Sequence, residues 1–220
     1  MTPQTTGNRF RIAALAVLIA AGLVGTAHAS EAKKRIKPAC HLVTDATDDA
    51  KNAASAKDPS LDIVSADVAT SKTQLTAVIR VAKLTTGVDP QAPLGRVWQI
   101  SMAVPGANAG QLVVGVSDGP FGVRDNDGIG GKVRLDPATN SVYVTESLSV
   151  LASSFHAHII NGKTRISQFI ATATAMIQEP AVAGLTTLNL PGGATDNAPT
   201  GGVSPSIYVA GTPSCLKVGS

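Results

Sequence analysis

The fold prediction starts from the stretch TQLTAVIRVA, residues 73–82. Its apolar residues recur at every second position: Leu75, Ala77, Ile79 and Val81. Successive side chains of an extended chain point to opposite faces, so this period is typical of a strand with one buried face. Residues 97–104 repeat the alternation around Trp98, which we therefore expect in the core. The two stretches predict two half-buried strands.

Further short strands are predicted along the chain, separated by frequent turn signals. A hairpin loop is expected at residues 136–140 and a short helix within residues 146–155. Residues 164–178 keep a helical spacing of apolar side chains but are dense in Thr and β-branched residues, so we predict mainly strand there. Residues 191–205, rich in Gly, Pro and Asn, are predicted to be a loop that precedes a last strand at residues 206–210.

Many short strands with hardly any helix predict an all-β fold. We expect an antiparallel, jelly-roll-like β-sandwich. The sequence shows no internal repeat and no boundary between residues 40 and 216, so this range is predicted to form one domain.

The N-terminus has the pattern of a secretory signal peptide. A short basic head with Arg9 and Arg11 precedes an apolar run over residues 12–25, and Ala27-His28-Ala29 has the small-x-small pattern of a cleavage site. We predict a signal peptide at residues 1–29, followed by a basic, flexible segment at residues 30–39. The apolar run is too short to span a bilayer, so we expect a secreted, extracellular protein with no transmembrane segment.

The chain has 2 cysteines, which lie far apart in the sequence. In the oxidising environment outside the cell, Cys40 and Cys215 are expected to form one disulfide that joins the two ends of the domain. The charged segment before Cys40 argues against a lipid anchor at that residue.

Carboxylates are concentrated at the start of the predicted domain. Asp45, Asp48 and Asp49 fall within residues 44–49, and Asp62 opens a predicted strand. Calcium takes six to eight oxygen ligands, which clustered loop carboxylates supply. The alternative is that Asp48 and Asp49 are solvated and that Asp62 caps a turn.

Four short segments resemble a pattern found in exported bacterial β-sandwich domains of the DOMON and family 9 carbohydrate-binding-module type: Cys40, residues 44–49, residues 61–66 and residues 195–198. Ala46 and Asp48 stand where that pattern has Pro and Gly. The resemblance implies that the sandwich holds calcium or a ligand. It also implies a set of calcium ligands: Asp45, Asp49, Asp62 and, as a weaker fourth, Asp196.

A second acidic stretch, Asp125-Asn126-Asp127-Gly128, does not fit an EF-hand. With Gly128 at the glycine position, the first and last ligands would be Val123 and Arg134, and neither side chain can coordinate calcium. We therefore predict a turn between strands.

Two further motifs raise the possibility of other chemistry. Ser117 stands in a Gly-x-Ser-x-Gly string like the nucleophile elbow of hydrolases, but Pro120 follows, which is a poor start for the helix that an elbow requires. His156 and His158 would share one face of a strand and could bind zinc or copper with a third ligand. Polar surface residues are the alternative that we favour for this pair.

These observations predict a secreted, non-enzymatic binding module stabilised by calcium. The ligand is expected to be a glycan, a cell-wall polymer or another extracellular protein. Basic residues are not clustered with aromatic ones, which argues against nucleic acid. Two alternatives stay open: a secreted serine hydrolase that uses Ser117, and a purely structural accessory module.

Overall fold

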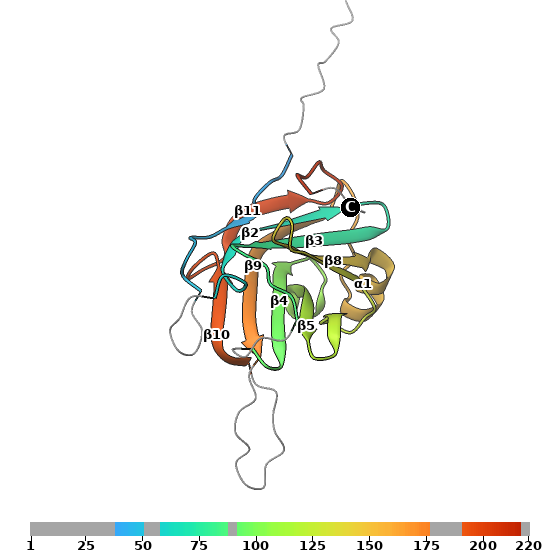
Figure 1. The fold of residues 1–220 in the computed structure, drawn as a ribbon. Helices are drawn as coiled ribbons and strands as arrows, with labels where there is room; N and C mark the ends of the chain where they lie inside the picture. Colours follow the sequence, from blue (N-terminus) through green and yellow to red (C-terminus); the bar gives the residue numbers. More distant parts are fainter. Residues whose placement is uncertain (1–37, 51–57, 88–91, 177–190, 217–220) are drawn as a thin grey trace, which may run out of the picture. The chain divides into compact units, whose positions relative to one another are not determined.

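The computed structural model describes residues 38–50, 58–87, 92–176 and 191–216. All of them belong to one compact unit. Two antiparallel sheets pack face to face in this unit, which confirms the predicted all-β sandwich (Figure 1). Among the described residues, no helix is long and apolar enough to cross a membrane.

In the described part of the chain, the first sheet has five strands in the order β1-β2-β3-β8-β7. Each neighbouring pair is antiparallel. Their bounds are β1 Val43–Thr44, β2 Ile63–Thr70, β3 Gln74–Val81, β8 Ser141–Ser147 and β7 Lys132–Asp136.

Six strands of the described residues form the second sheet. Five follow the order β10-β9-β4-β5-β6, and β11 also pairs with β9. The long strand β9 therefore carries β10 and β11 one after the other along the same side. The bounds are β10 Pro191–Ala198, β9 Arg165–Met176, β4 Gly95–Ala103, β5 Gln111–Gly119, β6 Gly122–Asp125 and β11 Ser204–Val209.

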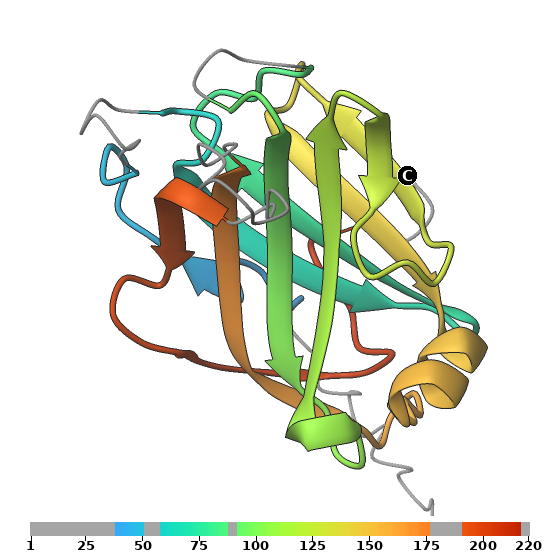
Figure 2. The ribbon, with the colours of Figure 1, turned by 90° about the horizontal axis from the view of Figure 1, so that it is seen from below.

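The two sheets contact each other along both sides of the sandwich. β10 contacts β2 at one edge, and β6 contacts β7 at the other. Figure 2 shows β1 and β10 on one side of the sandwich and β6 and β7 on the opposite side. We call these the β1/β10 edge and the β6/β7 edge.

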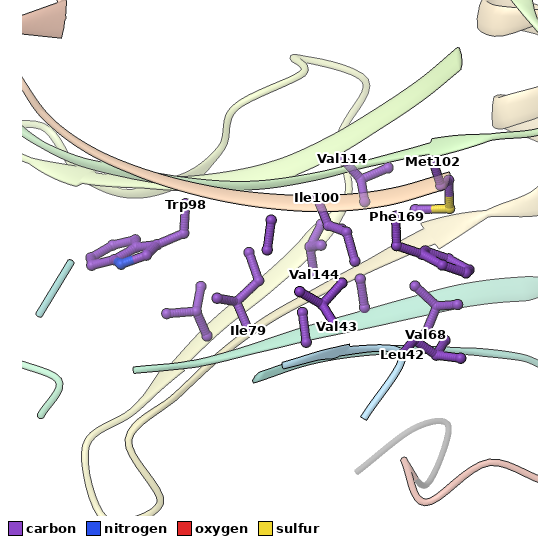
Figure 3. Packing of buried hydrophobic residues seen from close by; sticks show 14 of the residues in the cluster. Leu42, Val43, Val68, Ile79, Trp98, Ile100, Met102, Val114, Val144 and Phe169 are labelled. Atoms are coloured by element: carbon purple, nitrogen blue, oxygen red, sulfur yellow. The ribbon is translucent and has the colours of Figure 1, made fainter. Parts of the chain in front are cut away.

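The core lies between the sheets. Every apolar residue of the alternating series in β3 is buried, and Trp98 is completely enclosed, its indole N–H donating to the carbonyl of Ser60 at 2.8 Å. Side chains of Ile100 and Val114 point toward those of Ile79 and Val144 from the other sheet (Figure 3). The alternation in residues 73–82 and the core position of Trp98 are thus confirmed.

The second face of β3 is also largely buried, which differs from the half-buried strand that we predicted. Val78 packs with Ala69 and Leu216, and Tyr143 lies against them. The physical reason is that residues 214–216 lie over the outer face of the first sheet and shield it from water.

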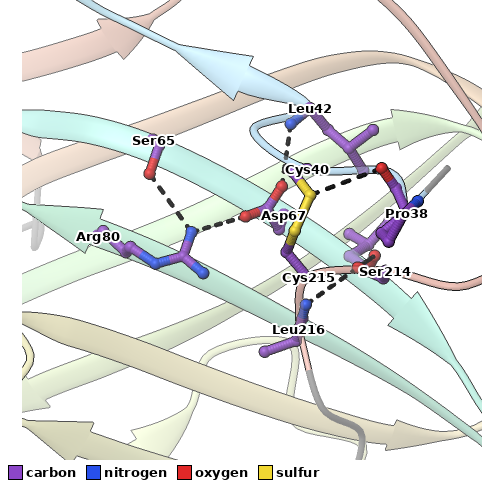
Figure 4. The surroundings of a disulfide bond; sticks show 10 residues. Pro38, Cys40, Leu42, Ser65, Asp67, Arg80, Ser214, Cys215 and Leu216 are labelled. Carbon is purple, nitrogen blue, oxygen red and sulfur yellow. Dashed lines mark hydrogen bonds and ion pairs between the residues drawn. A yellow bond between two sulfur atoms is a disulfide. The ribbon is translucent and has the colours of Figure 1, made fainter.

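A disulfide holds that end of the chain in place. Cys40 and Cys215 are bonded, with their Cα atoms 5.2 Å apart, which confirms the predicted pairing. The N–H of Cys215 donates a hydrogen bond to the carbonyl of Ala39 at 3.1 Å. Next to the disulfide, the carboxylate of Asp67 accepts a hydrogen bond from the N–H of Leu42 and forms an ion pair with Arg80 (Figure 4).

The less certain sequence predictions have mixed outcomes. The long strand is confirmed at Arg165–Met176, and the short helix forms as α1, Leu148–Phe155. The 136–140 hairpin loop is also confirmed, between β7 and β8. The loop predicted over residues 191–205 is wrong in its first half, because Pro191–Ala198 forms β10. Pairing with the free side of β9, through a register shift, outweighs the local Gly and Pro preference.

Candidate metal centre

Asp196 is the carboxylate that links the two sheets at the β1/β10 edge. It lies in β10 opposite Ala173, whose side chain is in the core, so Asp196 also points between the sheets. Its Oδ2 accepts the N–H of Ile63, the first residue of β2, at 2.7 Å. A strand of the second sheet is thereby tied to the start of a strand in the first.

Two further carboxylates meet Asp196 from the other end of the chain. Asp45 directly follows β1, and Asp49 lies in the loop after it. One oxygen from each of the three carboxylates lies within 4.8 Å of the others. The structure therefore brings together Asp45, Asp49 and Asp196, three of the four residues predicted as calcium ligands.

Thr200 orients part of this cluster. Its N–H donates to Asp45 Oδ1 at 3.0 Å, and its hydroxyl lies 2.8 Å from the same oxygen and 3.1 Å from Asp49 Oδ2. The other two oxygens, Asp45 Oδ2 and Asp49 Oδ1, are buried and accept no hydrogen bond from the described residues. Both carboxylates thus keep one desolvated oxygen available for a ligand.

Asp62, the fourth predicted ligand, lies beside the cluster and has a different role in the structure. It is only 2% exposed, and its Oδ2 accepts the N–H of Asp48 at 2.7 Å. This bond fixes the loop that carries Asp49. The donor, Asp48, has a φ of 71°, which is unusual outside glycine. The second oxygen, Asp62 Oδ1, is buried without a hydrogen-bond partner.

Burial and mutual repulsion disfavour the charged form of the carboxylates in this cluster. Burial, reinforced by the negative charges of Asp49 and Asp45, raises the pKa of Asp196 to about 6, although the N–H of Ile63 opposes the shift. Burial also raises the pKa of Asp62. Within the described part of the chain, no Lys or Arg forms an ion pair with any of these four carboxylates. A bound cation would remove the electrostatic cost of keeping them ionised.

The donor set suits a hard cation. Carboxylate and hydroxyl oxygens are the ligands that calcium prefers, whereas zinc favours nitrogen and sulfur. If each carboxylate binds through one oxygen, the cluster supplies fewer ligands than the six to eight that calcium takes. The other positions fall to backbone carbonyls, to water or to oxygens of a bound partner.

The second acidic stretch forms the predicted turn but also part of a larger cluster. Oxygens of Asp125, Asp127 and Glu146 lie within 4.8 Å of one another. Sequence reasoning missed Glu146. A signal was present, because Glu146 continues the alternation of Val142 and Val144 and so occupies a core-facing position.

Ser117 does not lie in the geometry that a nucleophile elbow requires. It is inside β5, paired with Val97 on one side and Arg124 on the other, and the strand continues through Gly119. Its side chain is largely buried, and its hydroxyl donates a long bond of 3.5 Å to the carbonyl of Arg124. The strand-to-helix turn of an elbow is absent from this described segment.

The histidine pair does not lie on a strand. His156 caps the C-terminus of α1 with a φ of 56°, and His158 follows in the loop. Among the residues described, the groups of three side chains that could hold a metal ion include neither histidine.

Comparison with family models, with curated proteins and with solved structures finds no match for this chain. The resemblance to the DOMON and family 9 carbohydrate-binding-module type therefore stays a prediction. Function has to be argued from the geometry of the site.

Proposed function

We propose that this chain is an exported, non-enzymatic binding module whose β1/β10 edge holds a calcium ion. The observation that carries the proposal is the convergence of Asp45, Asp49 and Asp196 from opposite ends of the sequence. Two of their oxygens are buried and accept no hydrogen bond from any residue that the structure describes. Three carboxylates brought together in this way repel one another unless a cation or protons neutralise them.

The position of the cluster supports a role in binding. Asp45 and Asp49 are partly exposed, and Thr200 is exposed, so the ion would be reached from solvent. Its free coordination positions would accept oxygens of a ligand. Hydroxyl and carboxylate groups of a glycan or a cell-wall polymer, or the carboxylates of an extracellular protein, have the required chemistry.

Export is consistent with two features of the molecule. The Cys40–Cys215 disulfide is of the kind that persists outside the cytosol. The N-terminal signal-peptide pattern lies outside the described residues and remains a sequence prediction.

The proposal is tested by titrating calcium into the oxidised, chelator-treated protein and then measuring sedimentation with insoluble glycans and wall polymers. We expect calcium to bind with a dissociation constant on the order of 10⁻⁴ to 10⁻³ M, as in extracellular modules. Asp196→Asn should lose this site and any calcium-dependent sedimentation. Asp136→Asn, the same change at a hairpin away from the cluster, should retain both.

Two results would contradict the proposal in different ways. Unchanged calcium binding by Asp196→Asn would show that the ion is not held at this edge. Calcium binding without sedimentation with any polymer or pull-down of an extracellular protein would leave a structural accessory module as the function.

A further inference from the structure

The β6/β7 edge contains a buried carboxylate that the proposed function does not use. Glu146 lies in β8 opposite Leu75 and shares the core-facing side of the strand with Val142 and Val144. It is only 2% exposed, and within the described part of the chain its Oε1 accepts no hydrogen bond. A glutamate at such a position is costly unless its charge is neutralised.

Asp125 faces Glu146 from the other sheet. It closes β6 opposite Val116, whose side chain is in the core, so Asp125 also points between the sheets. Asp127 follows in the turn, and its Oδ2 is a second buried oxygen without a hydrogen-bond partner. Unpaired oxygens of Asp127 and Glu146 thus lie in one cluster with the carboxylate of Asp125.

The loop after Asp125 is shaped around these carboxylates. The N–H groups of Gly130 and Gly131 donate to Asp125 Oδ2 at 2.9 and 3.0 Å. A Cβ atom on Gly131 would overlap the carboxylate of Glu146, so a glycine is needed for the approach of Glu146. The two hydrogen bonds fix Asp125 in position, and Gly131 leaves the space that the carboxylate of Glu146 occupies.

We propose that Asp125, Asp127 and Glu146 bind a second divalent cation, of the hard, oxygen-preferring class to which calcium belongs. The site is independent of the one at the β1/β10 edge, because it shares no residue with it and lies at the opposite edge of the sandwich. An ion here would connect Glu146 of the first sheet to Asp125 of the second. The competing occupant is a proton shared among the three carboxyl groups.

The test counts bound calcium by native mass spectrometry and calorimetry in the Asp196→Asn background, where the first site is disabled. We expect one ion per chain in Asp196→Asn and none in Asp196→Asn with Glu146→Gln. Asp196→Asn with Asp136→Asn, the matched control, should retain one ion. Asp127→Asn provides a second, partly exposed position, and a circular dichroism melt confirms that each variant is folded.

The outcomes separate this proposal from the first one. A folded Asp196→Asn protein that binds no calcium up to about 10 mM, well above the dissociation constants of extracellular modules, would overturn the second site and leave a proton-sharing cluster. An ion that persists in both Glu146→Gln and Asp127→Asn would also overturn it. Wild-type protein that binds one ion, retained in Asp196→Asn and lost in Glu146→Gln, would support this site and contradict the first.

Discussion

The two edges of the sandwich use the same chemistry over different distances in the sequence. At each edge, a core-facing carboxylate of the six-stranded sheet, Asp196 or Asp125, lies beside the other sheet. The β1/β10 edge joins residues from the two ends of the chain, whereas the β6/β7 edge joins neighbouring hairpins. The entropic cost of closing a loop grows with its length, so closure of the β1/β10 edge is the more demanding of the two.

Additional contacts are found where the closure is demanding. The β1/β10 side has the disulfide, the contacts of Thr200 with Asp45, and a bond from the Ser204 hydroxyl to the carbonyl of Leu42. At the β6/β7 edge, β6 pairs with β5 and β7 pairs with β8, and the acidic turn lies between β6 and β7. Carboxylate clusters thus lie at both edges, whereas the disulfide lies where the two ends of the domain meet.

The largest expected effect comes from removing the disulfide. Cys40→Ala with Cys215→Ala opens a connection between residues separated by 175 positions. In the chain-entropy model this lowers the free energy of unfolding by about 5 kcal/mol. Chemical denaturation measures the loss. Calcium binding at the β6/β7 edge should survive in the folded variant, and its loss would show that the two edges are not independent.

The next effect is a pH dependence of the chelator-treated protein. Burial, with added repulsion from neighbouring charges, raises the pKa of Asp196 to about 6 and that of Glu146 to about 8. Burial, followed by the neighbouring carboxylate of Asp125, raises the pKa of Asp127 to about 7. The folded state therefore holds protons that the unfolded state releases, so stability falls as the pH rises from about 5 to about 8.

Denaturation curves at several pH values check this prediction and assign it to the edges. Asp196→Asn should remove a part of the loss that is complete by about pH 6, and Glu146→Gln should remove the part that continues up to about pH 8. Saturating calcium should reduce the slope. Stability that rises with pH over this window in chelator would contradict the account.

A smaller effect is expected for Glu146→Gln, which should raise the stability of the protein in chelator and lower it in calcium. In chelator at a pH above 8, the neutral amide avoids a buried charge and can donate to Asp127, so the variant should be more stable by about 2 kcal/mol. In calcium the order should reverse, because the variant loses a ligand. Thermal melts in both buffers check the reversal. A variant less stable in both buffers would indicate a purely structural role.

The smallest effect is expected for Gly131→Ala. The added methyl group displaces the carboxylate of Glu146, which costs about 1 kcal/mol and weakens calcium binding at the β6/β7 edge alone. Gly202→Ala is the control, because a Cβ there meets nothing within 4 Å. Calorimetry with both variants measures the difference. Equal calcium affinities would show that the position of Glu146 does not matter.

Much of the fold was predictable because periodicity reports directly on strand faces. The alternation in residues 73–82 and around Trp98 identified two central strands and their buried sides. β10 was missed because Gly, Pro and Asn in residues 191–198 favour a loop locally, and only pairing with β9 makes them a strand. Burial of the outer face of β3 depends on the returning C-terminal segment, which no local pattern reveals.

The candidate sites were predictable to different degrees. The acidic residues near position 45 stood out as a cluster in the sequence, and the resemblance added Asp196 from the other end of the chain. Glu146 was missed because it is separated from Asp125 and Asp127 by a whole strand. The available signal was a charged residue at a core-facing position of an alternating strand. Glu146 becomes a candidate metal ligand only once the position of Asp125 on the opposite sheet is known.

Hydrogen exchange with and without calcium tests most directly whether cations close both edges. We predict slower exchange in calcium at the amides bonded to the clusters, those of Ile63 and Thr200 at one edge and of Gly130 and Gly131 at the other. Amides in the centres of β3 and β4 should be unaffected in local exchange. Exchange that calcium leaves unchanged at both edges would contradict the account.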